Sequence, residues 1–402
     1  MPQKPRILIL MHYLEIGGAE ISLIGLLNAI DTTKYDVDLF VYSHQGELMA
    51  LIPQGINLLP EKRKYSMIEK PMVTALKAGY IDIVAARVLA KYCSKRYYKL
   101  SNSVKENFSI FHYLYQYITP LLPEINPEIE YDLAIGFLSP FQILKDKVRA
   151  KRKIGWIHTD FNILEINRRA ELPVWDSCDH IASISDEVTK SFTSVFPTLK
   201  HKIIKIENIL SPTFVRQRAE GEDVSSEIAP KDGIINLLSV GRFCTAKNYD
   251  NVPFICKYLV DMGLNVRWYL IGFGGDEPLI RQKIAEAGMS EHVIILGKKS
   301  NPYPYIKACD IYVQPSRYEG KSVTVREAQM LCKPIVITNY PTAPSQVSDG
   351  VDGVIVPMDN KACAEGIKAL IENPALQQKI VCYLREHDYG NENEITKLYE
   401  LI

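Results

Sequence analysis

Residues 310–328 read DIYVQPSRYEGKSVTVREA, a stretch that predicts a strand, a turn and the beginning of a helix. The apolar run 311–313 is typical of a buried strand, and helical spacing begins at about Val323. A turn of this kind presents backbone N–H groups that bind phosphate in α/β proteins. Glu319 lies on the turn and Glu327 about one helical turn in, and carboxylates beside such a turn can accept hydrogen bonds from sugar hydroxyls. The stretch therefore indicates a nucleotide-sugar site, the alternative being an ordinary strand–loop–helix with two surface glutamates.

The same pattern of strand, turn and helix occurs twice along the 402-residue chain. It begins with the apolar run 7–11, the turn 16–20 and a helical repeat over 21–30, and it restarts near Gly233. Strands interleaved with helices predict parallel sheets covered by helices on both faces. We expect an α/β protein of two doubly wound, Rossmann-like domains with a cleft between them. Its other strands are predicted at 37–42, 133–136, 153–157, 180–184, 234–240, 266–271, 293–296 and 334–337.

The domain boundaries follow from this pattern. The N-terminal domain is placed at 1–210, the C-terminal domain at 211–375, and a helical tail at 376–402 is expected to pack back on the N-terminal domain. Residues 216–232 are polar and charged, which is typical of an interdomain linker or a mobile surface loop.

Composition limits the class of protein. The chain is 47% hydrophobic and 23% charged, as in soluble globular proteins, and its formal net charge of zero gives no electrostatic basis for nucleic-acid binding. The eight cysteines are scattered without a C-x-x-C pair, which argues against a zinc site or a disulfide framework and favours a reducing compartment. No signal-peptide pattern and no apolar stretch of membrane-spanning length is found. We therefore expect a cytoplasmic protein.

Residues 60–130 depart from the strand pattern. Between Glu61 and Lys105 there are eleven basic residues and three acidic ones. Helical spacing of apolar residues predicts an amphipathic helical insertion, the repeat being Leu76, Ile83, Val84, Val88, Leu89 and Tyr92. One interpretation is a platform on an anionic membrane, which would place the protein at the inner face of the plasma membrane. The other is a solvated helix face beside an ordinary core face.

Two cations follow the predicted strand 234–240. Arg242 and Lys247 are five residues apart at a strand–helix turn. A guanidinium and an ammonium group in this arrangement suit two neighbouring phosphates, although solvated cations on a loop would also account for them in isolation.

Together these segments resemble the retaining glycosyltransferases of the GT-B class, the family-four type that includes capsular-polysaccharide transferases. Residues 241–247 resemble the family's Gly-Arg-x4-Lys element, and residues 319–327 its glutamate-x7-glutamate element. In the first half, residues 17–20 resemble its glycine loop, and residues 156–160 resemble the segment with its active-site histidine. The resemblance covers most of the chain and is strongest over 234–358.

The resemblance implies that four residues act on the reacting groups. Arg242 and Lys247 would neutralise the donor diphosphate as it leaves, without a metal ion. Glu319 would hold hydroxyls of the transferred sugar near its 3-position, and His158 would contact the 6-hydroxyl of the same sugar.

The remaining implied residues bind the donor. Glu327 would accept hydrogen bonds from the ribose, and the backbone N–H groups of Ser322 and Val323 would bind phosphate oxygens. The other donor-binding positions are the glycine loop at Gly17 and Gly18 and the base-binding turn at Gly297 and Lys298. Lys321 and Ser322 stand where the family usually has an aromatic residue and a glycine, a departure that concerns the donor sugar more than the reaction.

The function implied is transfer of a hexose from a UDP- or GDP-sugar to a glycan or lipid-linked acceptor in cell-surface polysaccharide biosynthesis. No cofactor is expected. Residues 36–38 have the Asp-x-Asp spacing of metal-dependent transferases, but the period of two along a strand accounts for it, so no metal site is predicted. The alternatives are a non-catalytic nucleotide-sugar-binding protein and an epimerase or phosphorylase on the same scaffold.

Overall fold

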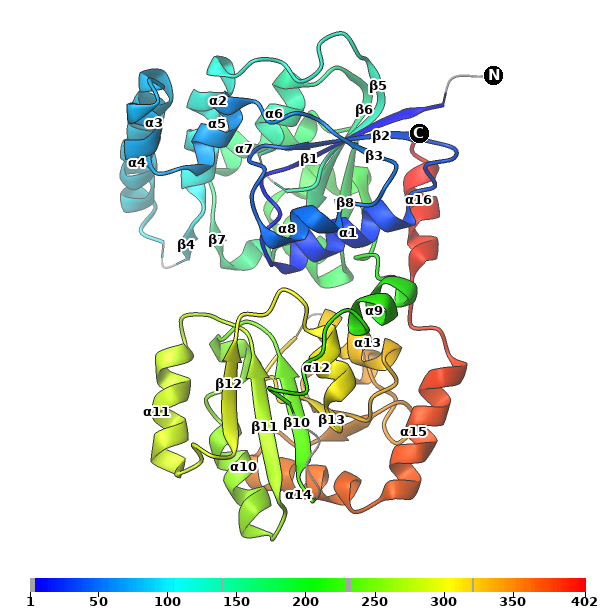
Figure 1. Ribbon diagram of the computed structural model, residues 1–402. Helices are drawn as coiled ribbons and strands as arrows, with labels where there is room; N and C mark the ends of the chain where they lie inside the picture. Colours follow the sequence, from blue (N-terminus) through cyan, green and yellow to red (C-terminus); the bar gives the residue numbers. More distant parts are fainter. Residues whose placement is uncertain (1–3, 104, 139, 229–232, 320–321) are drawn as a thin grey trace. The chain divides into compact units, whose positions relative to one another are not determined.

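The protein is described here by a computed structural model that covers residues 4–402 except 104, 139, 229–232 and 320–321. The chain forms two compact units, one of residues 1–210 with 391–402 and one of residues 211–390. Each unit is built on one large sheet in which all strand pairs are parallel, with helices between successive strands (Figure 1). The predicted α/β class and the two Rossmann-like sheets are confirmed.

The sheet of the first unit reverses its strand order between β1 and β5. Its order is β3-β2-β1-β5-β6-β8-β9. Ligands of such sheets bind beyond the carboxyl ends of the strands, next to the reversal. Residues 7–11 are almost completely buried because both faces of the sheet are covered. The strands are β1 (Arg6–Met11), β2 (Asp36–Val41), β3 (Ile56–Leu58), β5 (Tyr131–Gly136), β6 (Ala150–Ile157), β8 (His180–Ser183) and β9 (Ile203–Lys205).

The second sheet has the order β12-β11-β10-β13-β14-β15, the 3-2-1-4-5-6 order of dinucleotide-binding folds. Its reversal lies between β10 and β13. The buried Ser239 hydroxyl joins three central strands, because it accepts from Trp268 Nε1 at 2.9 Å and donates to the Val313 carbonyl at 2.6 Å. The strands are β10 (Ile235–Val240), β11 (Val266–Ile271), β12 (Val293–Gly297), β13 (Ile311–Gln314), β14 (Ile335–Thr338) and β15 (Val354–Val356).

Helices precede, connect or follow the strands of the two sheets. In the first unit these are α1 (Gly18–Ala29), α6 (Phe141–Lys147), α7 (Arg168–Asp176) and α8 (Asp186–Val195). In the second they are α9 (Pro212–Ala219), α10 (Val252–Asp261), α11 (Glu277–Ala287), α12 (Tyr303–Ala308), α13 (Val323–Met330), α14 (Asn360–Ile371) and α15 (Pro374–Glu386). None of the helices among the described residues is long and apolar enough to cross a membrane.

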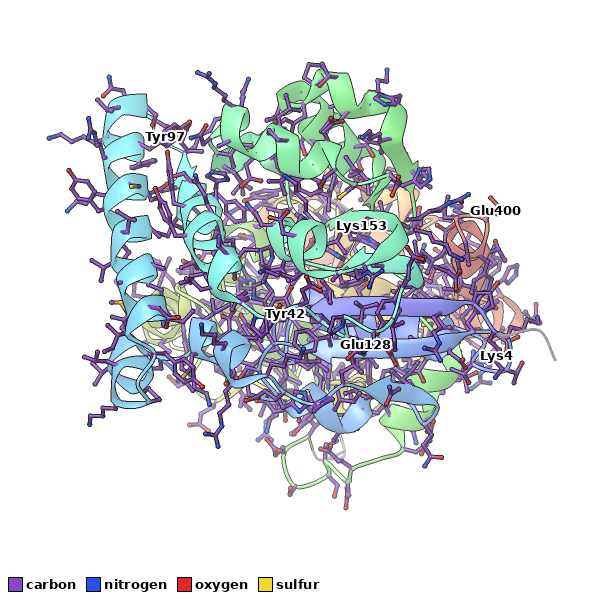
Figure 2. The ribbon with its side chains drawn as sticks, turned by 90° about the horizontal axis from the view of Figure 1, so that it is seen from above. Lys4, Tyr42, Tyr97, Glu128, Lys153 and Glu400 are labelled. Atoms are coloured by element: carbon purple, nitrogen blue, oxygen red, sulfur yellow. The ribbon has the colours of Figure 1, made fainter. Side chains whose placement is uncertain are left out.

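The insertion at 60–130 is mainly helical, as predicted. It contains α2 (Arg63–Glu69), α3 (Met72–Lys77), α4 (Ile81–Ser101) and α5 (Ser109–Ile118), and a short strand β4 (Glu106–Asn107) that pairs with β7 (Leu164–Glu165). Helix α4 lies at the outer edge of the first unit (Figure 2). Of the apolar repeat identified in the sequence, Ile83 is buried, whereas Leu76, Val88, Leu89 and Tyr92 are exposed. The inward side of α4 consists instead mostly of small residues, Ala86, Ala90 and Ser94, which allow close packing on α5.

Two expectations about segments between and after the domains were only partly right. The predicted interdomain linker or surface loop begins within a helix, because Arg216 lies in α9, and its residues up to 228 belong to the second unit, where Val224 and Ile228 are buried. The Glu227 carboxylate there accepts from the Tyr305 hydroxyl at 2.6 Å. Residues 229–232 lie outside the described residues.

The expected tail at 376–402 does not pack as one piece on the N-terminal domain. Helix α15 belongs to the second unit, where Ile380 and Leu384 are buried in the core. Only residues 391–402 group with the first unit, through helix α16 (Ile395–Tyr399) and a Tyr399 ring that stacks on Tyr35.

Two glycines after β11 support the loop that follows β10. Gly272 and Gly274 have φ angles of +152° and +156°, which L side chains rarely adopt. A Cβ atom at Gly272 would lie 1.9 Å from the carbonyl oxygen of Gly241, and one at Gly274 would lie 2.2 Å from that of Phe243. The loop carrying Arg242 therefore rests directly on the backbone of this Gly-x-Gly segment.

We predict that Gly272→Ala lowers the free energy of unfolding by about 2–3 kcal/mol, because backbone must move to admit the methyl group. Gly275→Ala is the matched control, since a Cβ atom there meets nothing within 4 Å. Thermal and urea unfolding of the two variants would measure the difference. Equal stability of the two would contradict the prediction.

Candidate functional site

Lys247 and Glu319, which the sequence places in separate motifs, meet at the strand reversal of the second sheet. Lys247 lies in a short 3-10 turn after β10, and Glu319 lies in the loop after β13. Lys247 Nζ is 2.6 Å from Glu319 Oε1, and only 17% and 11% of the two side chains are exposed. An ion pair so little exposed holds both side chains in one geometry, at the place where such sheets bind ligands.

Glu319 is held by residues that the sequence analysis did not identify. Its Oε1 atom also accepts hydrogen bonds from Ser316 Oγ at 2.6 Å and from Gln314 Nε2 at 3.2 Å. The Thr342 hydroxyl donates to the Glu319 carbonyl oxygen at 2.8 Å. The signal available in the sequence was a glutamine, Gln314, directly after the apolar residues 311–313. The carboxylate is thus oriented before any ligand arrives.

The turn that carries Lys247 is shaped by its backbone. Asn248 ends this turn in the left-handed region, with φ 61°, a conformation that asparagine tolerates better than most residues. Arg242, on the same loop, is exposed, and no ion pair between it and another described residue is present. The guanidinium is therefore accessible to an anion.

Glu327 lies on α13 and is buried, with 2% of its surface exposed. The Tyr303 hydroxyl donates to its Oε1 atom at 2.8 Å. Burial raises the pKa of the Glu327 carboxyl to about 7, although the hydrogen bond from Tyr303 acts in the opposite direction. Near neutral pH this carboxyl therefore exists in both protonation states.

The other predicted donor-binding positions of the second unit lie at the beginning of α13 or at the end of β12. Ser322 is buried and precedes the first residue of α13, Val323. Gly320 and Lys321 lie outside the described residues. At the end of β12, Gly297 has φ +74°, and the exposed Lys298 ammonium lies 5.4 Å from the centroid of the Phe273 ring.

In the first unit, the glycine loop begins α1. Gly17 precedes the helix in an extended conformation, and Gly18 is its first residue. A Cβ atom at Gly17 would lie 2.2 Å from Glu20 Oε2, so this carboxylate occupies the space beside the loop, whereas nothing lies within 4 Å of a Cβ atom at Gly18.

His158 follows β6 and packs its ring on Phe137, with 4.6 Å between the ring centroids. Burial lowers the pKa of His158 to about 4, against a hydrogen bond with the Phe137 backbone that raises it, so the imidazole is neutral at pH 7. Its Nε2 atom is buried, and no described residue forms a hydrogen bond to it. A neutral imidazole nitrogen in this state can bind a ligand hydroxyl.

The Asp-x-Asp segment has a structural role in the first unit. The Asp38 carboxylate on β2 accepts from the Tyr131 hydroxyl at 2.5 Å and from Asn57 Nδ2 at 2.6 Å. Among the residues that the structure describes, no group of three or more His, Cys, Asp and Glu side chains is suited to hold a metal ion.

The family model of the glycosyl transferases group 1 matches residues 222–387, which include Arg242, Lys247, Glu319 and Glu327. This part of the chain is thus similar to the glycosyl transferases group 1. The match agrees with the resemblance found in the sequence, and it covers most of the second unit.

Curated relatives match the chain over a similar length. The Campylobacter jejuni N-acetylgalactosamine-N,N'-diacetylbacillosaminyl-diphospho-undecaprenol 4-alpha-N-acetylgalactosaminyltransferase is 26% identical over 160 residues, 39% of this chain and 42% of that protein. The Staphylococcus aureus capsular polysaccharide biosynthesis glycosyltransferase CapM is 30% identical over 143 residues, 35% of this chain and 38% of that protein. The chain thus spans about two-fifths of the length of these relatives.

Solved structures share the fold over nearly the whole chain. Anabaena HepE in complex with UDP and glucose has a TM-score of 0.63 at 15% identity and covers 98% of both chains. Staphylococcus aureus TarM has a TM-score of 0.64 at 13% identity and covers 99% of both chains. The region that matches the family model is therefore the second of two Rossmann-like domains in a GT-B fold.

The raised pKa of Glu327 leads to a prediction about stability. The folded-state pKa of about 7 lies above the ordinary value of 4.5, so the folded state binds this proton more tightly than the unfolded state. The free energy of unfolding should therefore fall by about 3 kcal/mol between pH 4.5 and pH 7 and then level off.

Glu327→Gln should remove this part of the pH dependence. Its free energy of unfolding should fall less between pH 5 and pH 8 than that of the wild type. Unfolding followed at several pH values would measure it. Glu365→Gln, at an exposed glutamate on α14, is the control and should follow the wild type. Parallel pH profiles of Glu327→Gln and the wild type would show that the carboxyl titrates normally.

Proposed function

We propose that this chain is a retaining, metal-independent hexosyltransferase that transfers a sugar from a UDP- or GDP-sugar to a glycan or lipid-linked acceptor in cell-surface polysaccharide biosynthesis. The observation that carries the proposal is the pair of Lys247 and Glu319 at the strand reversal of a group 1 transferase domain. The names of the two curated relatives describe transfer to a diphospho-undecaprenol-linked glycan and capsular polysaccharide biosynthesis.

The donor diphosphate is held by the cations of the loop after β10. Among the described residues Lys247 has one anionic partner, Glu319, and the Arg242 guanidinium is exposed. A diphosphate provides further anionic partners for both cations, and its charge grows as the glycosidic bond breaks. The backbone N–H groups at the beginning of α13, from Ser322 and Val323, add donors that are oriented in advance.

Polar side chains that are buried or little exposed hold the transferred sugar and the ribose. Glu319, oriented by Ser316 and Gln314, accepts hydrogen bonds from hydroxyls of the transferred sugar. Glu327 exchanges its hydrogen bond with Tyr303 for the ribose hydroxyls. The neutral His158 binds another sugar hydroxyl through Nε2, which lacks a protein partner among the described residues.

The transfer itself requires no separate general base. Positive charge develops at the anomeric carbon while negative charge gathers on the leaving diphosphate. A leaving phosphate oxygen takes the proton of the acceptor hydroxyl, which attacks from the same face and retains the anomeric configuration. The contribution of the protein is to stabilise the leaving group and to orient the reactants.

A donor panel tests the proposal. UDP- and GDP-sugars are screened by thermal shift and by release of free nucleotide, with wild type, Glu327→Ala and Lys247→Gln. We expect one donor to stabilise the wild type and to be hydrolysed slowly, and Glu327→Ala to bind it more weakly. Lys247→Gln should lower turnover by about 10²–10³-fold, the usual effect of losing one group that stabilises developing charge.

Lys257→Gln is the control, because Lys257 is an exposed lysine on α10 that pairs only with Asp261 among described residues. It should retain wild-type turnover. If no nucleotide sugar binds or is hydrolysed, the proposed function is wrong; binding without release in the presence of acceptors would indicate a nucleotide-sugar-binding protein instead.

We also propose that the outer face of α3 and α4 holds the protein against an anionic membrane, at the inner face of the plasma membrane. Seven of the thirteen large hydrophobic side chains that are exposed among the described residues lie between Val73 and Leu100. The outer face of α4 is apolar in its first turns and basic in its last, with Ile81, Val88, Leu89 and Tyr92 followed by Lys95, Arg96 and Lys99.

The charge of this face is positive. Residues 72–101 contain six basic residues and one acidic residue, Asp82, which pairs with Lys64 at 2.7 Å. Arg87 turns inward and donates to the carbonyl oxygens of Met67 and Lys70. An exposed apolar strip beside basic side chains is the arrangement by which a helix lies in the surface of an anionic bilayer.

We predict that the protein co-sediments with vesicles containing an anionic phospholipid, that binding falls as salt is raised, and that vesicles of neutral phosphatidylcholine bind less. The double variant Lys95→Glu, Lys99→Glu should weaken binding at least about 10-fold, since each basic side chain near such a surface contributes about 1 kcal/mol. Lys190→Glu with Lys200→Glu makes the same charge change at exposed sites on α8 and after it, and should bind nearly as the wild type. If both double variants lost vesicle binding equally, the outer face of α3 and α4 would not be the membrane-binding surface.

A further inference from the structure

The hydroxyl of Tyr249 lies close to the side chain of Lys247. Tyr249 comes directly after the turn that carries Lys247, and it is part of the core of the second unit, with 1% of its surface exposed. A Cβ atom at Gly241 would lie 2.9 Å from the Tyr249 hydroxyl oxygen and 3.1 Å from Lys247 Cε. The hydroxyl and the lysine stem therefore pack together over Gly241, in space that a side chain there would fill.

This hydroxyl forms no hydrogen bond to another described residue. Burial raises the pKa of Tyr249, and Tyr312 and Glu319 add to this, so the phenol keeps its proton at neutral pH. The Gln314 amide lowers the pKa by placing an N–H near the phenol oxygen, but an N–H cannot accept the phenol proton. A buried O–H donor is thus left without an acceptor, which is unusual and destabilising.

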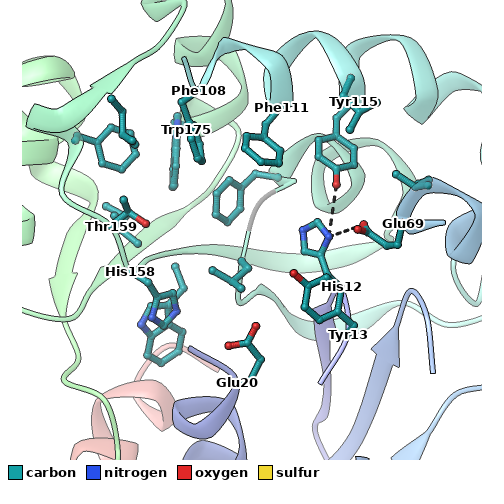
Figure 3. Close-up of a pocket in the computed structure, with 18 residues that line it drawn as sticks. His12, Tyr13, Glu20, Glu69, Phe108, Phe111, Tyr115, His158, Thr159 and Trp175 are labelled. Atoms are coloured by element: carbon teal, nitrogen blue, oxygen red, sulfur yellow. Dashed lines mark hydrogen bonds and ion pairs between the residues drawn. The ribbon is translucent and has the colours of Figure 1, made fainter. Parts of the chain in front are cut away.

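Buried polar atoms without a partner in the first unit have a different explanation. Trp156 Nε1 and His158 Nε2 also lack a hydrogen-bond partner among the described residues, but both side chains line a cavity of about 310 Å³. Figure 3 shows this cavity, which is lined as well by Phe111 of α5 and by His12 with its partner Glu69. A ligand in the cavity can satisfy such atoms. The tyrosine hydroxyl of the second unit lies in a core instead, so its acceptor has to come from the protein.

The Glu319 carboxylate is the neighbouring acceptor, and its Oε1 atom is fully used. Among the described residues, this oxygen accepts from Lys247 Nζ at 2.6 Å, from Ser316 Oγ at 2.6 Å and from Gln314 Nε2 at 3.2 Å. A carboxylate oxygen has two lone pairs, so three donors leave no room at Oε1 for a fourth. Competition with Lys247 accounts for the unused proton of Tyr249.

Binding of the proposed donor would remove one of these three hydrogen bonds. A diphosphate attracts the Lys247 ammonium, which has Glu319 as its anionic partner among the described residues. Glu319 is only 11% exposed, and a carboxylate so little hydrated is destabilised when its cation leaves. It would therefore need a replacement donor from within the protein.

We propose that Tyr249 is a positioning residue whose hydroxyl replaces Lys247 as hydrogen-bond donor to Glu319 when Lys247 turns to the donor diphosphate. This inference rests on the proposed function and adds a residue to the same site. Tyr249 contacts neither the nucleotide nor the sugar. It acts through Glu319, which stays ionised and oriented toward the hydroxyls of the transferred sugar while Lys247 neutralises the leaving group.

Thermal unfolding of the protein without donor gives the first test. Tyr249→Phe removes only the hydroxyl oxygen, and its unfolding midpoint should be equal to that of the wild type or about 2–4 °C higher, because the hydroxyl lacks an acceptor. In Lys247→Met the competing ammonium is absent, and Tyr249 should donate to Glu319. Adding Tyr249→Phe to Lys247→Met should therefore lower the midpoint by about 2–4 °C. The same change in both backgrounds would overturn the proposal.

Tyr131→Phe is the matched control for the loss of a buried hydroxyl. The Tyr131 hydroxyl in the first unit has two partners, because it donates to Asp38 Oδ2 at 2.5 Å and accepts from Asn126 Nδ2 at 2.9 Å. Its removal should lower the unfolding midpoint and leave turnover of the nucleotide sugar unchanged, the opposite of what is expected for Tyr249→Phe.

Affinity for the nucleoside diphosphate gives the second test, with UDP or GDP chosen by the donor panel. Tyr249→Phe should weaken binding about 10-fold in the wild type, because Lys247 then leaves Glu319 without a replacement. In the Lys247→Met background, where no exchange occurs, Tyr249→Phe should weaken it no further. A general structural defect would weaken binding in both backgrounds, and that result would contradict the proposal.

The two tests separate this inference from the proposed function. If the wild type hydrolyses a nucleotide sugar and Tyr249→Phe binds the diphosphate and turns over as the wild type does, the role of Tyr249 is wrong and glycosyl transfer stands. If no nucleotide sugar binds, the proposed function fails. The unfolding midpoints of the four proteins without donor then decide whether Tyr249 replaces Lys247 at Glu319.

Discussion

The contact between Lys247 and Glu319 is the interaction on which the candidate site depends. It joins the loops that follow β10 and β13, the strands between which the second sheet reverses its order. An ion pair with little solvent exposure adds little net stability, because the cost of desolvating both charges offsets their attraction. It does restrict both side chains to one geometry, and Ser316 and Gln314 bind the same carboxylate oxygen. The pair is thus better explained by orientation of a binding site than by stability.

Burial alters the protonation of two further candidate residues in opposite directions. It raises the pKa of Glu327 to about 7 and lowers that of His158 to about 4. The cause is the same in both, because a low-dielectric environment favours the uncharged form. At neutral pH, therefore, His158 is uncharged and Glu327 is partly so. Groups in these states suit hydroxyls, whereas the exposed Arg242 and the paired Lys247 suit phosphate.

The insertion presents different chemistry on its two sides. Helix α4 packs closely on α5 through Ala86, Ala90 and Ser94, and this leaves its larger apolar residues and its lysines on the outer face. Helix α5 in turn directs aromatic residues to the cavity of the first unit. A single helical segment thus presents an apolar and basic outer face to solvent and aromatic side chains to the cavity of the first unit.

The sequence by itself determined the two parallel sheets, most of their strands and the residues of the motifs. This was possible because strands buried on both faces are continuous apolar runs, and because Arg242, Lys247, Glu319 and Glu327 occur at fixed spacing after them. The short edge strands β3, β9 and β15 were missed, since three residues carry too little periodicity to be recognised. Only the tertiary structure decided which face of α4 is buried, that Lys247 pairs with Glu319 and that His12 lies beside Glu69. The two pairs join residues 57 and 72 positions apart, and the buried face of α4 is set by its packing on α5. Local spacing carries no information about such contacts.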